Sequence, residues 1–178
     1  MRPFLILQSV YTSMMKSRSV FAAIPLTLTV VVAVFLYSYT KKIDLNTSGG
    51  HNPIGTLKLV AGKCYGMTNR GGSNDGGVIF EWDPATNVYL KKIDLNCSIG
   101  CTPSGNLTLS GSKFYGMTRL GGTNSQGVVF EWDPVTNIYT KKIDLSTANG
   151  SLPYGNLAVY NNKMYGMTAF GGLNGDGV

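Results

Sequence analysis

A 50-residue repeat constrains the fold of this chain more than any other feature of its sequence. The two complete copies are identical at about three-fifths of their positions, and each begins with a tyrosine. A unit of this length cannot bury both of its faces alone, so neighbouring copies must stack. The copies span residues 39–88, 89–138 and 139–178, and the last of these is incomplete.

Each copy predicts four short antiparallel strands joined by turns. In the second copy the strands are expected at residues 107–109, 114–118, 128–132 and 139–145. Glycine, proline and asparagine separate them, and no stretch of the repeats has the apolar period of a helix. The pattern therefore predicts an all-β fold of four-stranded blades, a partial β-propeller. A flat β-solenoid is the alternative, but its repeats are usually shorter and its strands parallel.

The repeat motifs resemble those of Kelch repeats. A double glycine follows the second strand of every copy, and Asp-Pro, Thr-Asn and an aromatic residue follow the third strand. The wording Tyr-Gly-Met-Thr, Gly-Gly and Gly-Val-x-Phe-Glu-Trp-Asp-Pro is more similar to the bacterial tandem repeat called GloVer. That resemblance covers Tyr39 to Val178 and implies an exported, surface-destined protein. Kelch-like propellers are mostly binding scaffolds and only occasionally enzymes.

An uncharged apolar segment, Val20 to Tyr39, precedes the repeats. It is long enough to cross a bilayer as a helix, and Lys16 and Arg18 flank its N-terminal side. We expect residues 1–38 to form one hydrophobic helix that serves as an export signal or membrane anchor. Because the segment is rich in Val and Thr, a strand in a protein core is the alternative.

The positive charge of the chain does not indicate nucleic-acid binding. The formal net charge is +6, but all nine acidic residues lie within the repeats, whereas three basic residues precede them. The basic residues of the repeats are dispersed, whereas a nucleic-acid interface concentrates them on one face. We expect no nucleic-acid partner.

The repeat pattern is interrupted at both ends. Residues 27–34 read Thr-Leu-Thr-Val-Val-Val-Ala-Val where the register predicts Gly-Val-x-Phe-Glu-Trp-Asp-Pro. The chain therefore enters the repeat at its fourth, outermost strand. Fewer than three blades cannot close a ring, which needs about four to eight. We expect a fragment of a longer propeller, with self-assembly of open arcs as the alternative.

No catalytic, cofactor or metal site is expected. His51 is the one histidine, and a metal site of this kind needs three or four convergent ligands. The carboxylates that repeat once per copy are expected to bond backbone or neighbouring lysines rather than to act in pairs. They are Asp44, Asp94, Asp144, Glu81 and Glu131.

The three cysteines have different expected roles. Cys64 occupies a position that is Phe114 and Met164 in the other copies, so we expect a buried free thiol. Cys97 and Cys101 lie four residues apart in one loop, and a local disulfide is expected if the domain is exported. Two cysteines alone do not make a zinc site.

The loops that vary between copies are the candidate ligand-binding surface. In an up-and-down blade, the second–third loops and the blade-to-blade loops share one face, and most of the variation lies there. Drift of unimportant loops is the competing interpretation. The candidate residues are Asn69, Arg70, Arg119, Leu120, Tyr154, Ala169 and Phe170.

The sequence thus predicts a non-enzymatic, exported or membrane-anchored scaffold on a bacterial cell surface, binding a protein or a glycan. A carbohydrate-active propeller enzyme, with its catalytic residues in further blades, is the second hypothesis. A non-functional gene fragment is the third. The sequence does not indicate an oligomeric state.

Overall fold

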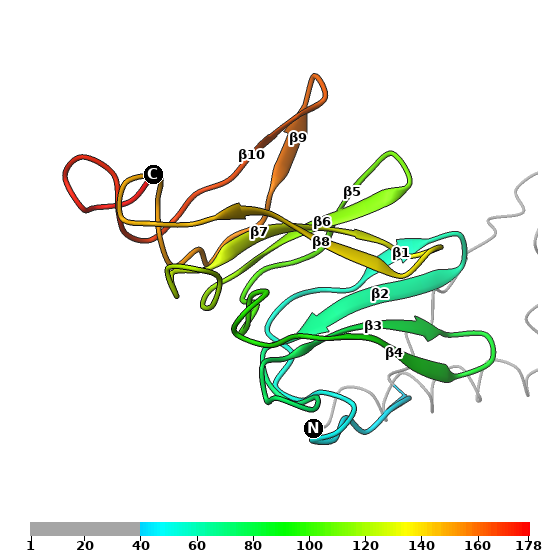
Figure 1. The fold of residues 1–178 in the computed structure, drawn as a ribbon. Helices are drawn as coiled ribbons and strands as arrows, with labels where there is room; N and C mark the ends of the chain where they lie inside the picture. The colour runs from blue at the N-terminus through cyan, green and yellow to red at the C-terminus, as the bar shows by residue number, and fades with distance from the viewer. Residues whose placement is uncertain (1–39) are drawn as a thin grey trace, which may run out of the picture. The chain divides into compact units, whose positions relative to one another are not determined.

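Ten β-strands in three sheets make up the regular structure of residues 40–178, the part of the chain that the computed structural model describes (Figure 1). Lys41–Val178 form one unit by their internal contacts. The helix expected within residues 1–38 lies outside the described residues. Within residues 40–178, no helix is long and apolar enough to cross a membrane.

The first two sheets each contain four strands, and the third contains two. Sheet 1 comprises β1 (Lys58–Val60), β2 (Lys63–Thr68), β3 (Val78–Asp83) and β4 (Val88–Asp94). Sheet 2 comprises β5 (Thr108–Ser110), β6 (Lys113–Thr118), β7 (Val128–Asp133) and β8 (Ile138–Asp144). Sheet 3 comprises β9 (Ala158–Tyr160) and β10 (Lys163–Tyr165).

Strands that follow one another in sequence are antiparallel neighbours in every sheet. The prediction of four antiparallel strands per repeat is confirmed, and each expected strand of the second copy begins and ends within one residue of the observed one. The same irregularity in register recurs at Ile79/Phe80 and at Val129/Phe130. The sequence repeat is therefore a repeat of backbone geometry as well.

The turn between β7 and β8 explains the repeated Asp-Pro-x-Thr-Asn motif. The Asp133 carboxylate accepts hydrogen bonds from the backbone N–H groups of Val135 and Thr136, at 2.9 and 3.2 Å. Asn137 adopts φ 58°, a conformation that asparagine tolerates better than most residues. Its side chain accepts a hydrogen bond from Trp132 Nε1 at 3.1 Å, which ties the turn to the sheet.

The double glycine allows two loops to meet at van der Waals distance. Gly121 has φ +85°, and a Cβ there would lie 2.7 Å from the carbonyl oxygen of Cys97. The next residue, Gly122, donates its N–H to the same carbonyl at 2.8 Å. A side chain at Gly121 would therefore both strain the backbone and separate the loops.

Side chains from sheet 1 and sheet 2 form a shared apolar core. Tyr65 of β2 packs against Phe114 and Trp132, with ring centroids 4.8 and 5.9 Å apart. Phe114 and Trp132 are completely buried, and Leu107 is nearly so. Burial of such side chains is the main favourable contribution to folding, so adjacent copies stabilise one another as the repeat predicts.

A buried threonine ends the second strand of sheet 1 and of sheet 2. The Thr118 hydroxyl accepts a hydrogen bond from Val128 N–H at 3.2 Å and donates one to the Leu120 carbonyl at 3.0 Å. Thr68 makes the same pair of bonds in sheet 1, and the partly exposed Thr168, which follows β10, makes it in the third copy. The threonine thereby holds the glycine-rich loop against the beginning of the third strand.

Substitution Thr118→Val should lower the free energy of unfolding by about 1–3 kcal/mol, because it leaves the buried Val128 N–H without its partner. Thr140→Val, at an exposed position on β8, serves as the control and should change stability little. Urea unfolding of both variants measures the difference. Equal stabilities would show that the hydroxyl is dispensable.

Candidate functional site

The candidate site is the loop face, the surface on which the loop before each sheet meets the loop between its second and third strands. The two loops exchange backbone hydrogen bonds in every copy. His51 pairs with Arg70, Cys101 with Leu120, and Ser151 with Phe170. The loops that vary in sequence thus lie together in space, because the antiparallel strand order places both at the same end of each sheet.

A polar cluster occupies the first copy on this face. Arg70 Nη1 lies 3.2 Å from the Asp75 carboxylate, and His51 Nε2 lies 3.5 Å from it. The Gly71 N–H also donates to Asp75 at 2.8 Å. This bond is the main reason that the pKa of the Asp75 carboxyl lies below its ordinary value, and the nearby Arg70 and His51 lower that pKa further. His51 therefore has charged companions that its sequence position did not indicate.

The side chains of Asn69 and Arg119 occupy equivalent positions and reach the loop of the next copy. Asn69 Nδ2 donates to the Pro103 carbonyl at 3.0 Å and lies 3.3 Å from Ser104 Oγ. The guanidinium of Arg119 lies over the ring of Tyr154, 5.0 Å from its centroid. Ser104 and Tyr154 also occupy equivalent positions. The same two positions of the repeat are therefore in contact in both cases, but with different side chains.

The other candidate residues either take part in these contacts or are exposed to solvent. Tyr154 and Phe170 are 52% and 53% exposed, whereas Leu120 is only partly exposed. The backbone N–H of Ala169 donates a hydrogen bond to the Leu152 carbonyl at 3.4 Å. The structure therefore brings Arg119 and Tyr154 together, engages Asn69 within the scaffold and leaves Phe170 open.

Three buried side-chain atoms on the loop face have no hydrogen-bond partner in the part of the chain that the structure describes: Thr102 Oγ1, Arg119 Nε and Gln126 Oε1. The Arg119 N–H donates to the Thr102 carbonyl at 3.2 Å, and the Gln126 carbonyl accepts from Leu152 at 2.9 Å. Buried polar atoms without a partner are uncommon in folded proteins. Here they include a donor, an acceptor and a hydroxyl that can be either.

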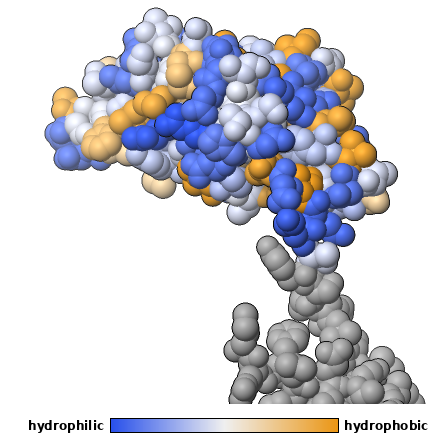
Figure 2. Space-filling model, turned by 90° about the horizontal axis from the view of Figure 1, so that it is seen from below, coloured by the Kyte–Doolittle hydropathy of each residue, from blue (hydrophilic) through white to orange (hydrophobic). Residues whose placement is uncertain are grey.

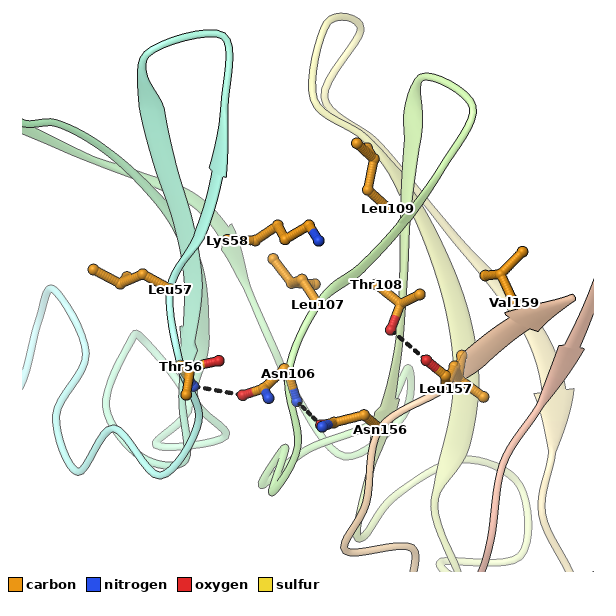
Figure 3. Close-up of a pocket in the computed structure, with 10 residues that line it drawn as sticks. All are labelled: Thr56, Leu57, Lys58, Asn106, Leu107, Thr108, Leu109, Asn156, Leu157 and Val159. Atoms are coloured by element: carbon orange, nitrogen blue, oxygen red, sulfur yellow. Dashed lines mark hydrogen bonds between the residues drawn. The ribbon is translucent and has the colours of Figure 1, made fainter.

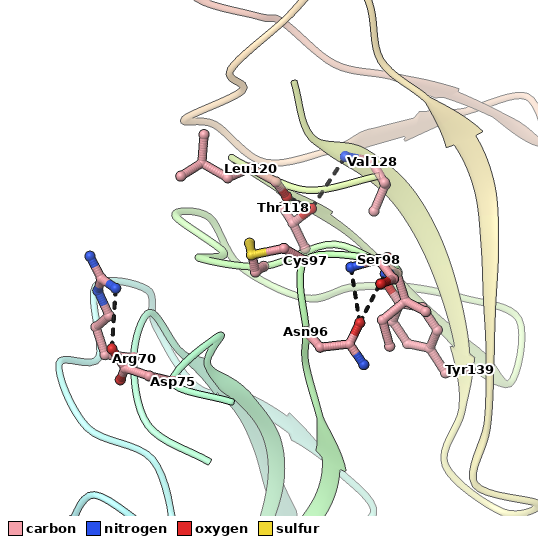
Figure 4. Close-up of a disulfide and its surroundings, with 11 residues drawn as sticks. Arg70, Asp75, Asn96, Cys97, Ser98, Thr118, Leu120, Val128 and Tyr139 are labelled. Carbon is pink, nitrogen blue, oxygen red and sulfur yellow. Dashed lines mark hydrogen bonds and ion pairs between the residues drawn. A yellow bond between two sulfur atoms is a disulfide. The ribbon is translucent and has the colours of Figure 1, made fainter. Parts of the chain in front are cut away.

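A disulfide braces the loop between sheet 1 and sheet 2. Cys97 and Cys101 are joined with an S–S distance of 2.13 Å, and Cys101 is completely buried (Figure 4). The Asn96 side chain accepts from Ser98 N–H at 3.0 Å within the same loop. Cys64 is a buried free thiol.

A tyrosine of the fourth strand, β8, is hydrogen-bonded to the same loop. The Tyr139 hydroxyl donates to the Ile99 carbonyl at 2.9 Å, and Tyr89 makes the equivalent bond to Gly49 at 2.5 Å. Burial raises the pKa of Tyr89 to about 12 and raises the pKa of Tyr139 as well. Both hydroxyls therefore remain donors over the whole physiological pH range.

The repeated carboxylates are engaged within their own sheets. Glu131 lies 2.7 Å from Lys113 Nζ, 2.8 Å from the Tyr115 hydroxyl and 3.6 Å from Lys142 Nζ. Asp144 accepts from Thr123 N–H at 2.7 Å and from Lys141 at 3.0 Å. The equivalent lysine contacts in the preceding copies involve Glu81 with Lys63 and Lys92, Asp94 with Lys91, and Asp44 with Lys41. Their bonding agrees with the structural role expected for them.

A groove of about 340 Å³ is lined by the first strand of each sheet, β1, β5 and β9, and by the residues just before it (Figure 3). Asparagine side chains connect one copy to the next along it. Asn106 Oδ1 accepts from Thr56 N–H at 2.5 Å, and Asn156 Oδ1 accepts from Asn106 N–H at 2.6 Å. Lys58 extends into the groove as an exposed cation. Within residues 40–178, no three His, Cys, Asp or Glu side chains are grouped to hold a metal ion.

The Gloeobacter/Verrucomicrobia repeat, a family defined by its sequence model, matches residues 26–178. The chain belongs to this family. The resemblance to the GloVer repeat is thereby confirmed, and the match to the Gloeobacter/Verrucomicrobia repeat begins thirteen residues before Tyr39, inside the apolar segment. No curated protein matches the chain.

Some residues of the loop face were not found by comparing the copies of the Gloeobacter/Verrucomicrobia repeat. Thr102 and Gln126 replace Asn52 and Gly76 of the first copy, and such replacements look like ordinary variation. Their importance depends on burial, which only the stacking of sheets determines. The sequence did contain a sign of the asparagine contacts, because the motif Gly105-Asn106-Leu107 recurs as Gly155-Asn156-Leu157.

Replacing both disulfide cysteines as the third copy does, with Cys97→Thr and Cys101→Ser, should lower stability by about 2 kcal/mol, because the closed loop is short. Ser151 is buried at the equivalent position, so serine fits there. Denaturation with and without reductant measures the effect. The native chain should lose stability on reduction and the variant should not; equal insensitivity of both would contradict the prediction.

The stabilising contribution of Glu131 should disappear in acid. Hydrogen bonds from Lys113 and Tyr115 lower its carboxyl pKa from the ordinary 4.5, so its contribution is complete above pH 4.5 and is lost as pH falls through the lower folded pKa. Glu131→Gln removes the titrating group but keeps its size. Urea unfolding at pH 7 and pH 3 should show a difference between wild type and variant that shrinks in acid. A difference independent of pH would refute this role of the charge.

Proposed function

We propose that the four-stranded sheets are blades of a Kelch-like β-propeller. The order of strands within each sheet, with connections only between neighbours, supports this architecture. The segments that lead into the first strands of successive sheets are also joined directly, through Asn106 and Asn156, as blades around a common axis would be. Further copies of the same repeat would complete the ring.

We infer that this propeller is an exported, surface-anchored binding scaffold. The uncharged segment Val20 to Tyr39 and the basic residues before it support export or anchoring. The disulfide between Cys97 and Cys101 supports an oxidising environment, where such bonds persist. In this arrangement the scaffold presents its variable loops outside the cell.

The loop face is proposed to bind a carbohydrate, and the pair Arg119–Tyr154 carries this proposal. The Tyr154 ring is half exposed, with the guanidinium 5.0 Å from its centroid. The Arg119 guanidinium supplies hydrogen-bond donors, and the Tyr154 hydroxyl can act as a donor or an acceptor. Sugars offer hydroxyl groups that need both, together with apolar C–H faces that pack on aromatic rings. A protein ligand would use the same exposed rings.

A microarray of microbial and plant oligosaccharides, probed with the full chain, tests the proposal. We expect one glycan class to bind, and Tyr154→Ala and Arg119→Ala to weaken that binding at least about tenfold. Tyr154→Phe keeps the ring and is the matched control. Val135→Ala, in the turn between β7 and β8, is the control away from the loop face.

The two alanine variants should remain folded, because Tyr154 is half exposed and Arg119 lies on a loop. Binding that is equal in wild type and in both alanine variants would place the glycan elsewhere. Carbohydrate recognition by this face would be refuted if the wild type bound no glycan more strongly than the alanine variants do.

A further inference from the structure

Arg119 is the only charged residue in the three loop segments that meet where the second copy joins the third. Residues 97–106, 119–127 and 147–157 exchange backbone hydrogen bonds there and contain no other lysine, arginine, aspartate or glutamate. The carboxylate at the end of β8, Asp144, is already bonded to Lys141 and to the Thr123 N–H. The loops around Arg119 therefore do not neutralise its positive charge.

The first copy contains the counterion that the second copy lacks. On the same loop face, Arg70 lies 3.2 Å from the carboxylate of Asp75. The position of Asp75 is Ser125 in the second copy. Arg119 accordingly forms no ion pair within residues 40–178, and its charge is available to an anionic group of a ligand.

A polar or charged surface does not by itself mark a site on this molecule. Figure 2 shows hydrophilic residues across the middle of the surface seen from below, with apolar residues toward its sides. Lys42, Lys58 and Lys163 also lack an ion pair in the described part of the chain, but they are exposed and no aromatic ring there lies beneath them. Arg119 differs because it is half-buried and its guanidinium lies 5.0 Å from the centroid of the Tyr154 ring.

The guanidinium of Arg119 is held in place while its outer end stays accessible. Nε is its only nitrogen that is buried without a partner among the described residues. The two terminal nitrogens make no hydrogen bond to those residues either, and they are therefore open to solvent. An arginine stacked on an aromatic ring keeps the N–H groups at the edge of its plane free, and this fork matches the two oxygens of a carboxylate.

The exposure of Tyr154 is a property of its position in the repeat. Tyr154 is 52% exposed with sheet 2 before it, and Ile54, at the same position but followed by a complete copy, is 56% exposed. Ser104, which has a neighbouring sheet on both sides, is still partly exposed. The site is therefore accessible within a larger array of copies as well.

We propose that the Arg119–Tyr154 pair binds an acidic sugar, whose carboxylate pairs with the Arg119 guanidinium while the sugar ring packs on the exposed part of Tyr154. This inference rests on the proposed carbohydrate binding and adds the class of sugar, a uronic acid or another carboxylated sugar. A neutral sugar would displace water from the Arg119 cation without supplying an anion, which is unfavourable. A carboxylated sugar supplies the counterion that Asp75 supplies to Arg70.

Calorimetric titration of the full chain with uronic-acid oligosaccharides and with their methyl esters tests this inference. Each acid and its ester share one sugar and differ in the charge of the carboxyl group. The panel comprises oligomers of galacturonic, glucuronic, mannuronic and guluronic acid. We expect at least one acid to bind about tenfold more tightly than its ester, because only the acid forms a charge-assisted pair with Arg119.

Two variants show whether the preference comes from Arg119. Arg119→Asn should abolish it, and asparagine is the native residue at the equivalent Asn69, so this substitution suits the fold. Lys58→Gln removes an exposed charge from β1, away from the loop face, and should leave the preference unchanged. The two variants carry the same change in net charge, so a difference between them is not a general effect of charge.

Equal affinity for acid and ester, with binding still lost in Tyr154→Ala, would overturn the acidic sugar and leave the proposed carbohydrate binding intact. A preference for the acid that survives in Arg119→Asn would overturn the role of this arginine. A sulfated oligosaccharide bound as tightly as the best uronate would show that any anion is accepted, against the choice of a carboxylate. If no glycan of any kind binds, both the proposed function and this inference are wrong.

Discussion

Packing of one sheet on the next is the interaction on which the rest of this structure depends. The strands are short, and β1, β5 and β9 have only three residues each, so a single sheet cannot bury a core by itself. The contact of Tyr65 with Phe114 and Trp132 supplies that core between sheet 1 and sheet 2. Stability is thus a property of neighbouring copies together rather than of any one copy.

The loop face inherits its geometry from this packing. Because the sheets stack in register, the side chain at the end of each second strand meets the loop of the following copy. Asn69 reaches Pro103 and Arg119 reaches Tyr154 by the same route, with different chemistry at each junction. A constant framework therefore carries variable contacts, which is how a scaffold can change its ligand without changing its fold.

Much of the fold could be predicted from the residues, but less of the site. The strands of the second copy were expected within one residue, because turn motifs such as Asp133-Pro134 and the double glycine have strong local conformational preferences. The variable loops were also expected together. What their side chains do was not predictable: Asn69 proves to be bound within the scaffold, and His51 lies beside Asp75. Such contacts join residues from different loops, as His51 and Asp75 do, or from different copies, as Asn69 and Pro103 do, so the order of residues along the chain does not reveal them.

By itself, the sequence determined the repeat, its strands and turns, and hence an all-β chain whose copies must stack. Local backbone preference and the spacing of apolar residues are sufficient for these features, since both act within a few residues. Only the tertiary structure decided which atoms are buried without partners, as for Arg119 Nε, and which apolar side chains a neighbouring sheet covers, as for Met67. Burial depends on what the neighbouring sheet covers, and identical residues such as Met67 and Met167 can therefore have opposite environments.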